Sequence, residues 1–227
     1  MRISDTALIV PAHNESRVIV ATLTKALESF THVVCVDDGS TDDTADLART
    51  TGAKVLSHPV NVGQGAAIQT GIEYARRLPV DLFVTFDADG QHRTEDVLAM
   101  RETLLREAVD IVLGSRFLGT SKSVPRMKRL LLRAAVVFSN LTSGLRLTDA
   151  HNGLRVFNRQ VAETIDLQEP GYRHASEFTE KIARHRYTYR EAPVVIEYSR
   201  YSMAKGQSAL NAVNILVDTV TAKAISR

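Results

Sequence analysis

Five short apolar runs, rich in β-branched residues, alternate with helical patterns along the first half of the chain. The runs are ALIVP (7–11), HVVCVDD (32–38), AKVLSH (53–58), DLFVTFDAD (81–89) and DIVLGSRF (110–117). Runs of this composition are typical of strands in a sheet that is covered on both faces. The alternation predicts an α/β fold, with a doubly wound, mostly parallel sheet and helices on both of its faces.

The pattern changes after residue 120. There the sequence predicts a basic and apolar helix over 126–143, a strand over 153–158, a helix over 174–185, a strand over 192–199 and a last helix from 209. A chain of 227 residues can bury a substantial core, and we expect it to form a single domain. No apolar stretch reaches the length of about 18 residues that a membrane span needs, and no segment is typical of a signal peptide.

The composition argues against two further classes of protein. The net charge is only +2, and basic residues do not interleave with aromatic ones, so nucleic-acid binding has no support. The single cysteine, Cys35, lies in an apolar run, which rules out a disulfide framework. We therefore expect a core cysteine and a cytoplasmic protein, either free or peripheral at the inner face of the membrane.

Each of the five apolar runs is followed by an unusual polar segment. The segments are PAHNE (11–15), DDGS (37–40), NVGQG (61–65), DADGQH (87–92) and GSR (114–116). Taken singly they can be loops or helix caps, and Ser40 and Asp43 can cap the helix that follows them. Because the carboxyl ends of parallel strands form the ligand crevice of an open α/β sheet, we expect the five segments to form one site.

Two aspartates and a glutamine in DADGQH suggest a metal site. Asp87 and Asp89 are two residues apart, and a turn at Gly90 can bring Gln91 beside them. Mg²⁺ takes one or two carboxylates and binds substrate phosphates, so a nucleoside diphosphate is the economical ligand. The glycines of NVGQG match neither the dinucleotide-binding nor the P-loop spacing. They can allow a close approach to a ligand or simply form a turn.

Taken in order, PAHNE, VDDGSTDDT, NVGQGAA, DADGQH, GSRF and DAHNGLRVFNR resemble the inverting family-2 glycosyltransferases of GT-A fold. The resemblance is greatest to the branch of dolichyl-phosphate mannose synthases and polyprenyl-phosphate glycosyltransferases. It implies a hexosyltransferase that uses Mg²⁺ or Mn²⁺, a nucleotide-diphospho-sugar donor (GDP-mannose or a UDP-sugar) and a lipid-phosphate acceptor. It also implies one glycosyltransferase domain over residues 1–227, with a nucleotide-sugar-binding half (1–118) and an acceptor-side half (119–227).

Carried over by position, the resemblance implies a role for individual residues. The residues implied to bind the nucleotide sugar are Pro11, Asn14, Glu15, Asp38 and Asp87, and those implied to hold the metal are Asp87, Asp89 and Gln91. The residues implied to be catalytic are Asp89, Arg116 and Asp149, with Arg155 supporting the site. Arg116 would also face the acceptor phosphate, joined by Arg129 and Arg133 from the following helix. His13 and Leu132 depart from the family pattern, where an aromatic and a hydroxyl residue are expected.

The chemistry depends on the acceptor. The metal would neutralise charge on the departing diphosphate while an oxygen attacks the anomeric carbon in line. A lipid phosphate is already an anion at neutral pH, because its second pKa is about 6, and needs no general base. A glycan hydroxyl, as in cell-surface polysaccharide synthesis, would need a carboxylate base, with Asp149 the first candidate and Glu177 the second. A catalytically silent nucleotide-sugar-binding module is the alternative outside the enzyme class.

The helix predicted over 126–143 carries Arg126, Arg129 and Arg133 on one face beside a broad apolar face. This pattern suits a membrane surface, a grip on an acceptor phosphate, or simple packing. Lys205, before the last helix, can reach the diphosphate, and that helix can contact a second copy or a membrane partner. His58, His92, His151 and His174 lack metal-ligand spacing, and we assign them no role.

Overall fold

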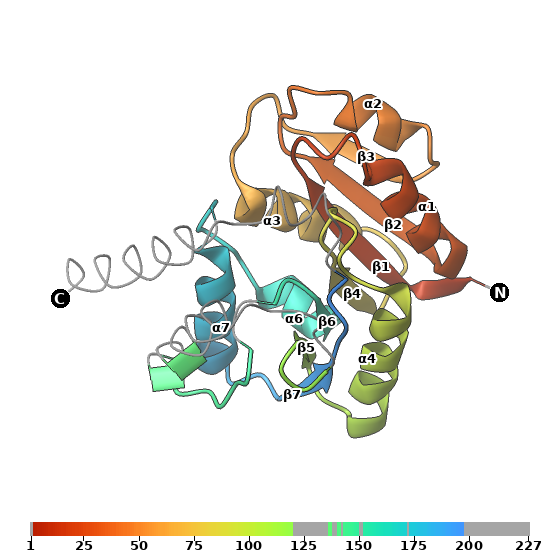
Figure 1. Cartoon of the computed structure of the whole chain (residues 1–227). Coiled ribbons are helices and arrows are strands. Elements are labelled where there is room, and N and C mark those ends of the chain that lie inside the picture. Colours follow the sequence, from red (N-terminus) through yellow and green to blue (C-terminus); the bar gives the residue numbers. More distant parts are fainter. Residues whose placement is uncertain are drawn as a thin grey trace, which may run out of the picture.

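The computed structural model describes residues 2–119, 136–137, 140–141, 143–149, 152–171 and 173–197. A seven-stranded sheet runs through the molecule (Figure 1). Its strands are β1 (Ile3–Ala12), β2 (Phe30–Asp37), β3 (Lys54–Ser57), β4 (Leu82–Thr85), β5 (Ile111–Ser115), β6 (Arg155–Asn158) and β7 (Tyr189–Pro193). Their order is β3-β2-β1-β4-β6-β5-β7, and only the pairs that involve β6 are antiparallel. The predicted mostly parallel sheet is confirmed.

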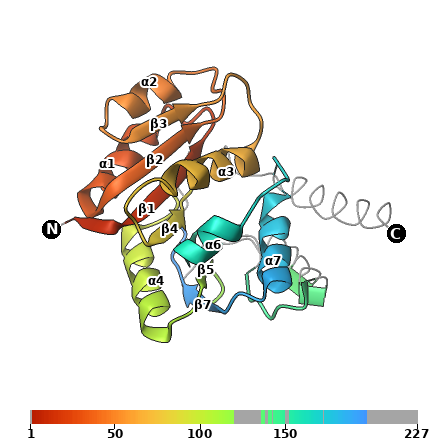
Figure 2. The same cartoon turned by 180° about the vertical axis from the view of Figure 1, so that it is seen from behind.

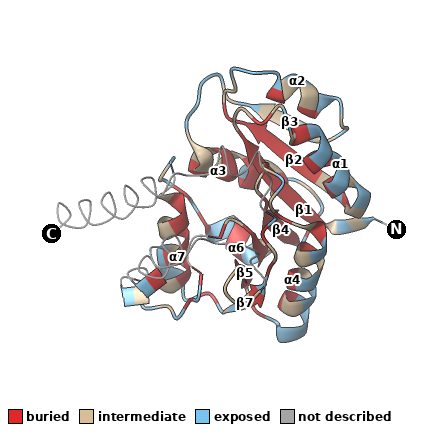
Figure 3. Ribbon diagram, viewed as in Figure 1, coloured by how far each residue is buried: buried red, intermediate tan, exposed pale blue. Residues whose placement is uncertain are grey.

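Helices cover both faces of this sheet. They are α1 (Ile19–Ser29), α2 (Thr44–Arg49), α3 (Gln64–Ala75), α4 (Thr94–Glu107), α6 (Arg159–Thr164) and α7 (His174–His185). Leu8 and Val10 of β1 join a core with α1 and α4, whereas Ala7 and Ile9 join a second core with α3, α6 and α7. Figure 2 shows α3 and α6 in front of the sheet, and Figure 3 shows the buried strands between the two helical layers. The doubly wound arrangement is therefore confirmed.

The order of the strands creates a crevice at one edge of the sheet. The chain runs from β1 outward through β2 to β3 and then returns to the other side of β1 to form β4. The carboxyl ends of β1 and β4 therefore flank a topological switch point, where open α/β sheets bind ligands. Because β6 is antiparallel to β4 and β5, its first residue, Arg155, pairs with Thr85 and Leu113 near the ends of those strands. Arg155 thus reaches the same edge.

Two expectations drawn from the sequence need correction. The last strand is Tyr189–Pro193 and not 192–199, because the polar start of β7 pairs with β5 at the edge of the sheet. Val194 and Ile196 are buried in the core, although they lie beyond the strand. Their apolar character reflects side-chain burial and not strand pairing.

The cap of α2 also differs from the expectation. Asp42, and not Asp43, accepts a hydrogen bond from the Thr44 backbone N–H at 3.0 Å, and the Ser40 hydroxyl accepts one from the Asn14 N–H at 2.9 Å. By contrast, the helix predicted over 174–185 is confirmed as α7. The helix predicted from 209 and most of 126–143 lie outside the described residues. No described helix is both long and apolar enough to cross a membrane.

Candidate active site

Asp87, which follows β4, is held by donors on both of its oxygens. The Gln64 side-chain amide donates to Oδ1 at 3.0 Å, and His92 Nε2 lies 2.9 Å from Oδ2. Burial alone would raise the pKa of Asp87, but the hydrogen bond and charge of His92, together with the charges of Arg155 and His174, lower it below its ordinary value. Asp87 is therefore an ionised carboxylate with a fixed orientation.

Asp89 lies in a more negative environment. Burial and the neighbouring charges of Asp87 and Glu15 raise the pKa of Asp89 to about 6, against the opposing effect of His92. The Gln91 backbone N–H donates to Asp89 Oδ1 at 3.0 Å, and the Gln91 side-chain amide donates to Oδ2 at 2.6 Å. This end of the site therefore carries an excess of negative charge, which a bound cation would relieve.

The residues present fit a divalent cation. A Cβ at Gly153 would lie only 2.7 Å from Asp87 Oδ1, so the backbone approaches this carboxylate as closely as a glycine allows. Within the described ranges, no three or more His, Cys, Asp and Glu side chains form a metal cluster. Mg²⁺ needs only one or two carboxylates when substrate phosphates and water complete its shell. Gln91 contacts Asp89 through its amide nitrogen, so in this arrangement it orients the carboxylate.

The predicted nucleoside-binding residues meet where β1 and β2 end. Pro11 pairs with Val36 in the sheet, and Glu15 is buried, with its backbone N–H bonded to the Thr44 hydroxyl at 2.7 Å. Asn14 adopts a left-handed conformation, with φ 54°, and its side-chain oxygen accepts from the Thr41 N–H at 2.8 Å. Asn14 therefore ties the loop after β1 to the loop after β2.

Asp38 organises the loop after β3. Its carboxylate accepts hydrogen bonds from the Val62 N–H at 3.0 Å and the Gly63 N–H at 2.7 Å, and His58 Nδ1 lies 2.7 Å from Oδ1. Burial would raise the pKa of Asp38, but these hydrogen bonds lower it. Asp38 is thus an ionised carboxylate at the expected donor edge, and much of its hydrogen-bonding capacity holds the chain itself.

Arg116 and Asp149, which the sequence predicts near the acceptor and the reacting sugar, form an ion pair. Arg116 donates to Asp149 Oδ2 from its side-chain Nε at 2.6 Å and from its backbone N–H at 3.1 Å. The two side chains are 13% and 1% exposed. The Asp149 backbone N–H also donates to Glu191 at 3.0 Å. The structure therefore brings the two residues together, and the Asp149 carboxylate is neutralised by Arg116.

Arg155 lies between the two ends. It is 2% exposed, and its guanidinium lies 4.6 Å from the centre of the Phe178 ring. Burial lowers the pKa of Arg155 to about 10, while the charges of Asp87 and Asp149 act in the opposite direction. Its Nη1 finds no hydrogen-bond partner within the described part of the chain. Arg155 is therefore a buried cation that interacts electrostatically with both Asp87 and Asp149.

Sequence reasoning missed two histidines that support the site. His92 is 7% exposed and holds Asp87, and His58 bridges Asp38 and the Thr70 hydroxyl, which lies 3.0 Å from its Nε2. The assignment of no role to these two residues was therefore wrong. Each contact lies on a turn beyond a strand end, and only the position of His92 within DADGQH could have suggested it.

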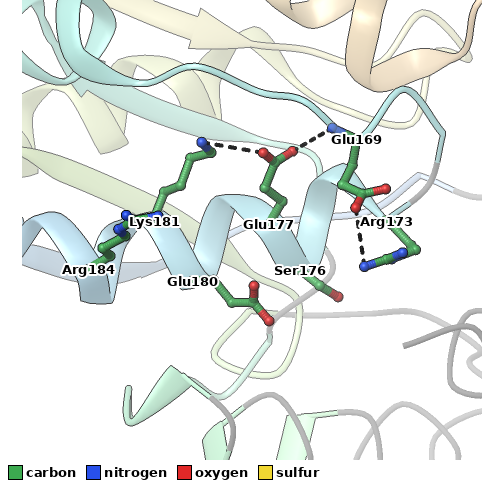
Figure 4. Close-up of a pocket in the computed structure, with 7 residues that line it drawn as sticks. All are labelled: Glu169, Arg173, Ser176, Glu177, Glu180, Lys181 and Arg184. Atoms are coloured by element: carbon green, nitrogen blue, oxygen red, sulfur yellow. Dashed lines mark hydrogen bonds and ion pairs between the residues drawn. The ribbon is translucent and has the colours of Figure 1, made fainter. Parts of the chain in front are cut away.

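Glu177, the second candidate for a general base, holds the backbone of residues 168 and 169. Its carboxylate accepts hydrogen bonds from the Gln168 and Glu169 backbone N–H groups at 2.9 Å each, and Lys181 lies 3.3 Å away. Figure 4 shows Glu177 in a groove along α7 lined by charged side chains. The lining residues are Glu169, Arg173, Ser176, Glu177, Glu180, Lys181 and Arg184. None of them belongs to the predicted donor or metal set.

Several predicted site residues fall outside the described part of the chain. They are Arg126, Arg129, Arg133 and Lys205; Leu132 and His151, to which we assign no role in the site, also lie there. The residues brought together at the carboxyl edge of the sheet are therefore those of the donor side, the metal end and the Arg116–Asp149 pair.

The fold is of the GT-A type, and comparison with known proteins agrees. The structure superposes on glucosyl-3-phosphoglycerate synthase from Mycobacterium tuberculosis, solved with Mg²⁺ and uridine diphosphate, with a TM-score of 0.68. The match has 19% identity and covers 94% of this chain and 78% of that chain, so it shows the fold alone.

The sequence profile of glycosyl transferase family 2 matches residues 7–166, and the chain belongs to this family of glycosyltransferases. It is 28% identical over 225 residues to the UDP-N-acetylglucosamine–dolichyl-phosphate N-acetylglucosaminyltransferase of Methanococcus voltae, covering 89% of this chain and 90% of that protein. It is also 28% identical over 214 residues to the polyprenol monophosphomannose synthase of Mycolicibacterium smegmatis, covering 88% and 80%.

Proposed function

We propose that this glycosyltransferase moves a sugar from a nucleotide-diphospho-sugar to a polyprenyl phosphate, with inversion at the anomeric carbon. The observation that carries the proposal is the buried Arg116–Asp149 ion pair. A hydroxyl acceptor needs a general base, and the first candidate for it is an ion-paired carboxylate that is 3% exposed. A phosphate oxygen is already an anion and needs none.

The donor end would hold the nucleotide sugar through a divalent cation. Asp87 and Asp89 would bind Mg²⁺ or Mn²⁺, which supplies charge neutralisation for the leaving nucleoside diphosphate. Gln64 and His92 hold Asp87, and Gln91 holds Asp89, so both carboxylates are oriented in advance. Pro11, Asn14, Glu15 and Asp38 would contact the nucleoside, and Lys205 the diphosphate.

The names of two relatives support a polyprenyl phosphate as the acceptor. One is named for transfer of N-acetylglucosamine and the other for a mannose product, yet both names specify a polyprenyl-type phosphate lipid. The shared element is the lipid phosphate and not the sugar. We propose that Arg116, with Arg129 and Arg133, faces that phosphate, and that GDP-mannose and UDP-sugars are the donors to compare.

A lipid acceptor also bears on where the enzyme works. A polyprenyl phosphate resides in a membrane, so the active edge must meet the membrane surface. We therefore propose a peripheral position at the cytoplasmic face, on the lipid or on a membrane partner protein. Self-association would be a separate property, which we assign to the helix predicted from residue 209.

The metal part of the proposal is tested with Asp89→Ala. Calorimetric titration with Mn²⁺, and then with GDP or UDP in the presence of Mn²⁺, should show metal-dependent diphosphate binding in the wild type and a loss of at least about tenfold in the variant. Asp81→Ala, an exposed aspartate just before β4, is the matched control and should bind like the wild type. Unchanged affinity in Asp89→Ala would remove Asp89 from the metal site.

The acceptor part is tested by comparing acceptors. Labelled GDP-mannose, UDP-glucose and UDP-N-acetylglucosamine are each offered with a polyprenyl phosphate, the matching polyprenol and a soluble oligosaccharide. We expect transfer to the phosphate alone, because only that acceptor carries its own charged nucleophile. Equal transfer to the polyprenol or to the oligosaccharide would refute the phosphate as nucleophile.

A further inference from the structure

The glycines before and within α3 make room for the chain itself. Gly63 has φ +114°, and a Cβ on it would lie 2.8 Å from the Pro170 carbonyl carbon. A Cβ on Gly65 would lie 2.7 Å from the His174 Cβ, closer than real Cβ contacts come. The sequence suggests a close approach to a ligand or a turn, whereas the atoms nearest these two glycines belong to residues 169–171 and His174 of the same chain.

The same contact fixes the first turn of α3. The Pro170 carbonyl accepts hydrogen bonds from the Gly65 N–H at 2.6 Å and from the Ala66 N–H at 3.4 Å. Further along the helix, the Gln69 side-chain oxygen accepts from the Leu167 N–H at 3.0 Å. The first N–H groups of a helix have no partner within the helix, so an external carbonyl both satisfies them and sets the position of the turn. We call residues 167–171 the clamp segment.

Gln64 lies between the two glycines and is the first residue of α3. Its side-chain Nε2 donates to Asp87 Oδ1 at 3.0 Å, while His92 lies on Oδ2. A carboxylate has about four acceptor positions, so each oxygen keeps capacity for a cation after accepting one hydrogen bond. An amide carries no charge, and it can therefore orient Asp87 without competing electrostatically with the metal.

We infer that Gln64 is a positioning residue for the metal site, and that the clamp segment holds it in place. The inference rests on the proposed function, because it needs a cation at Asp87 and Asp89. It assigns a task to Gln64 of the NVGQG segment, and it makes the donor end depend on backbone groups of residues 167–171. Groups that orient a metal ligand in this way typically affect metal affinity by about 10–100-fold.

The test is Gln64→Leu, which keeps a similar volume but removes the donor. Mn²⁺ affinity is measured by electron paramagnetic resonance of the free ion, with the protein metal-free at the start. We expect binding about tenfold weaker than in the wild type. Gln160→Leu, on an exposed position of α6, is the matched control and should bind like the wild type.

A second readout separates positioning from damage to the fold. At saturating Mn²⁺, Gln64→Leu should regain wild-type affinity for the nucleoside diphosphate, and its melting temperature without metal should stay near that of the wild type. Loss of diphosphate affinity that excess Mn²⁺ does not restore would overturn the inference. Gln64→Ala repeats the measurement with a smaller side chain and good helix propensity, so the test does not depend on how one variant folds.

The outcomes separate this inference from the proposed function. If the wild type binds Mn²⁺, Asp89→Ala loses it and Gln64→Leu weakens it, both stand. If Asp89→Ala loses Mn²⁺ but both Gln64 variants bind it like the wild type, the metal site stands and the positioning role is refuted. If the wild type binds Mn²⁺ neither alone nor together with GDP or UDP, the metal site and the inference fall together.

Discussion

The two ends of the proposed active site, the metal end at Asp87 and Asp89 and the acceptor end at Arg116 and Asp149, surround their carboxylates with opposite charges. At the acceptor end, Asp149 is paired with Arg116 at 2.6 Å. At the metal end, Asp89 lies near Asp87 and Glu15, and these charges, after burial itself, raise its pKa to about 6. Among the described residues, the acceptor end pairs its carboxylate with a cation, whereas the metal end places carboxylates near one another.

This difference indicates what each end is built to receive. Neighbouring carboxylates with a raised pKa favour a bound cation, so the proposed metal end suits a cation in addition to those that the described residues supply. The proposed acceptor end already has its cation, Arg116, which on our proposal would also face an incoming anion. Arg155, buried between them, interacts electrostatically with Asp87 and Asp149 and connects the two ends.

The largest expected change in stability comes from removing the Arg116 side chain, which breaks the ion pair with Asp149. Arg116→Met leaves Asp149 buried without its ionic partner, and we expect a loss of about 3–5 kcal/mol in the free energy of unfolding, measured with urea. The control is Arg49→Met, which breaks the exposed Arg49–Asp46 pair and should cost less than about 1 kcal/mol. Similar losses in both variants would mean that the Arg116–Asp149 pair is effectively solvated, and the contrast between the ends would disappear.

A smaller loss of stability should follow from a substitution at Gly65 that displaces the clamp segment, residues 167–171, from α3. Gly65→Ala would favour an isolated helix by up to about 1 kcal/mol. Here the added methyl group meets His174 and the Glu169 carbonyl, and we expect a net loss of about 1–3 kcal/mol. Mn²⁺ affinity should fall as well, because Gln64 moves with the turn.

Gly52→Ala is the control for this prediction. A Cβ at Gly52 meets no atom within 4 Å, so its cost comes only from the positive φ of +89°, and Mn²⁺ affinity should not change. If Gly65→Ala stabilises the protein and binds Mn²⁺ normally, the metal end does not depend on the acceptor-side half.

The smallest expected effect is a gain in the free energy of unfolding and not a loss. In metal-free protein, the raised pKa of Asp89 means that its stabilising contribution is present below about pH 4 and is lost as the pH rises through about 6. Asp89→Asn lacks this loss, so at pH 7.5 in EDTA it should be more stable than the wild type by roughly 1–2 kcal/mol, allowing for solvent screening. At pH 4 the two proteins should be nearly equal.

Thermal melting at the two pH values measures this difference. Other titrating groups are common to both proteins and cancel in the comparison. Added Mg²⁺ should stabilise the wild type more than Asp89→Asn and so reduce the gap. If Asp89→Asn is less stable than the wild type at pH 7.5 in EDTA, the neighbouring negative charges do not destabilise the ionised Asp89 carboxylate.

Much of the fold was accessible from local patterns. Alternation of apolar runs and helical spacing predicted the α/β sheet, and the polar segments after the strands predicted the edge that carries the site. The segment that became β7 was misplaced because Val194 and Ile196 are apolar for side-chain packing, while the true strand, Tyr189–Pro193, is mostly polar at the edge of the sheet. Local hydrophobicity does not distinguish these two causes.

The sequence by itself determined the fold class, the family and the residues that gather at the carboxyl edge, because periodicity and strand-end motifs involve neighbours along the chain. Only the tertiary structure decided which of those residues act on one another. Arg116 and Asp149 are 33 positions apart, and Gln64 and Asp87 are 23 apart. Such pairs depend on the order of the strands, on the antiparallel strand β6, and on the Pro170 carbonyl that accepts hydrogen bonds from the first turn of α3. The electrostatic contrast between the two ends therefore arises from the fold and cannot be read from any single motif.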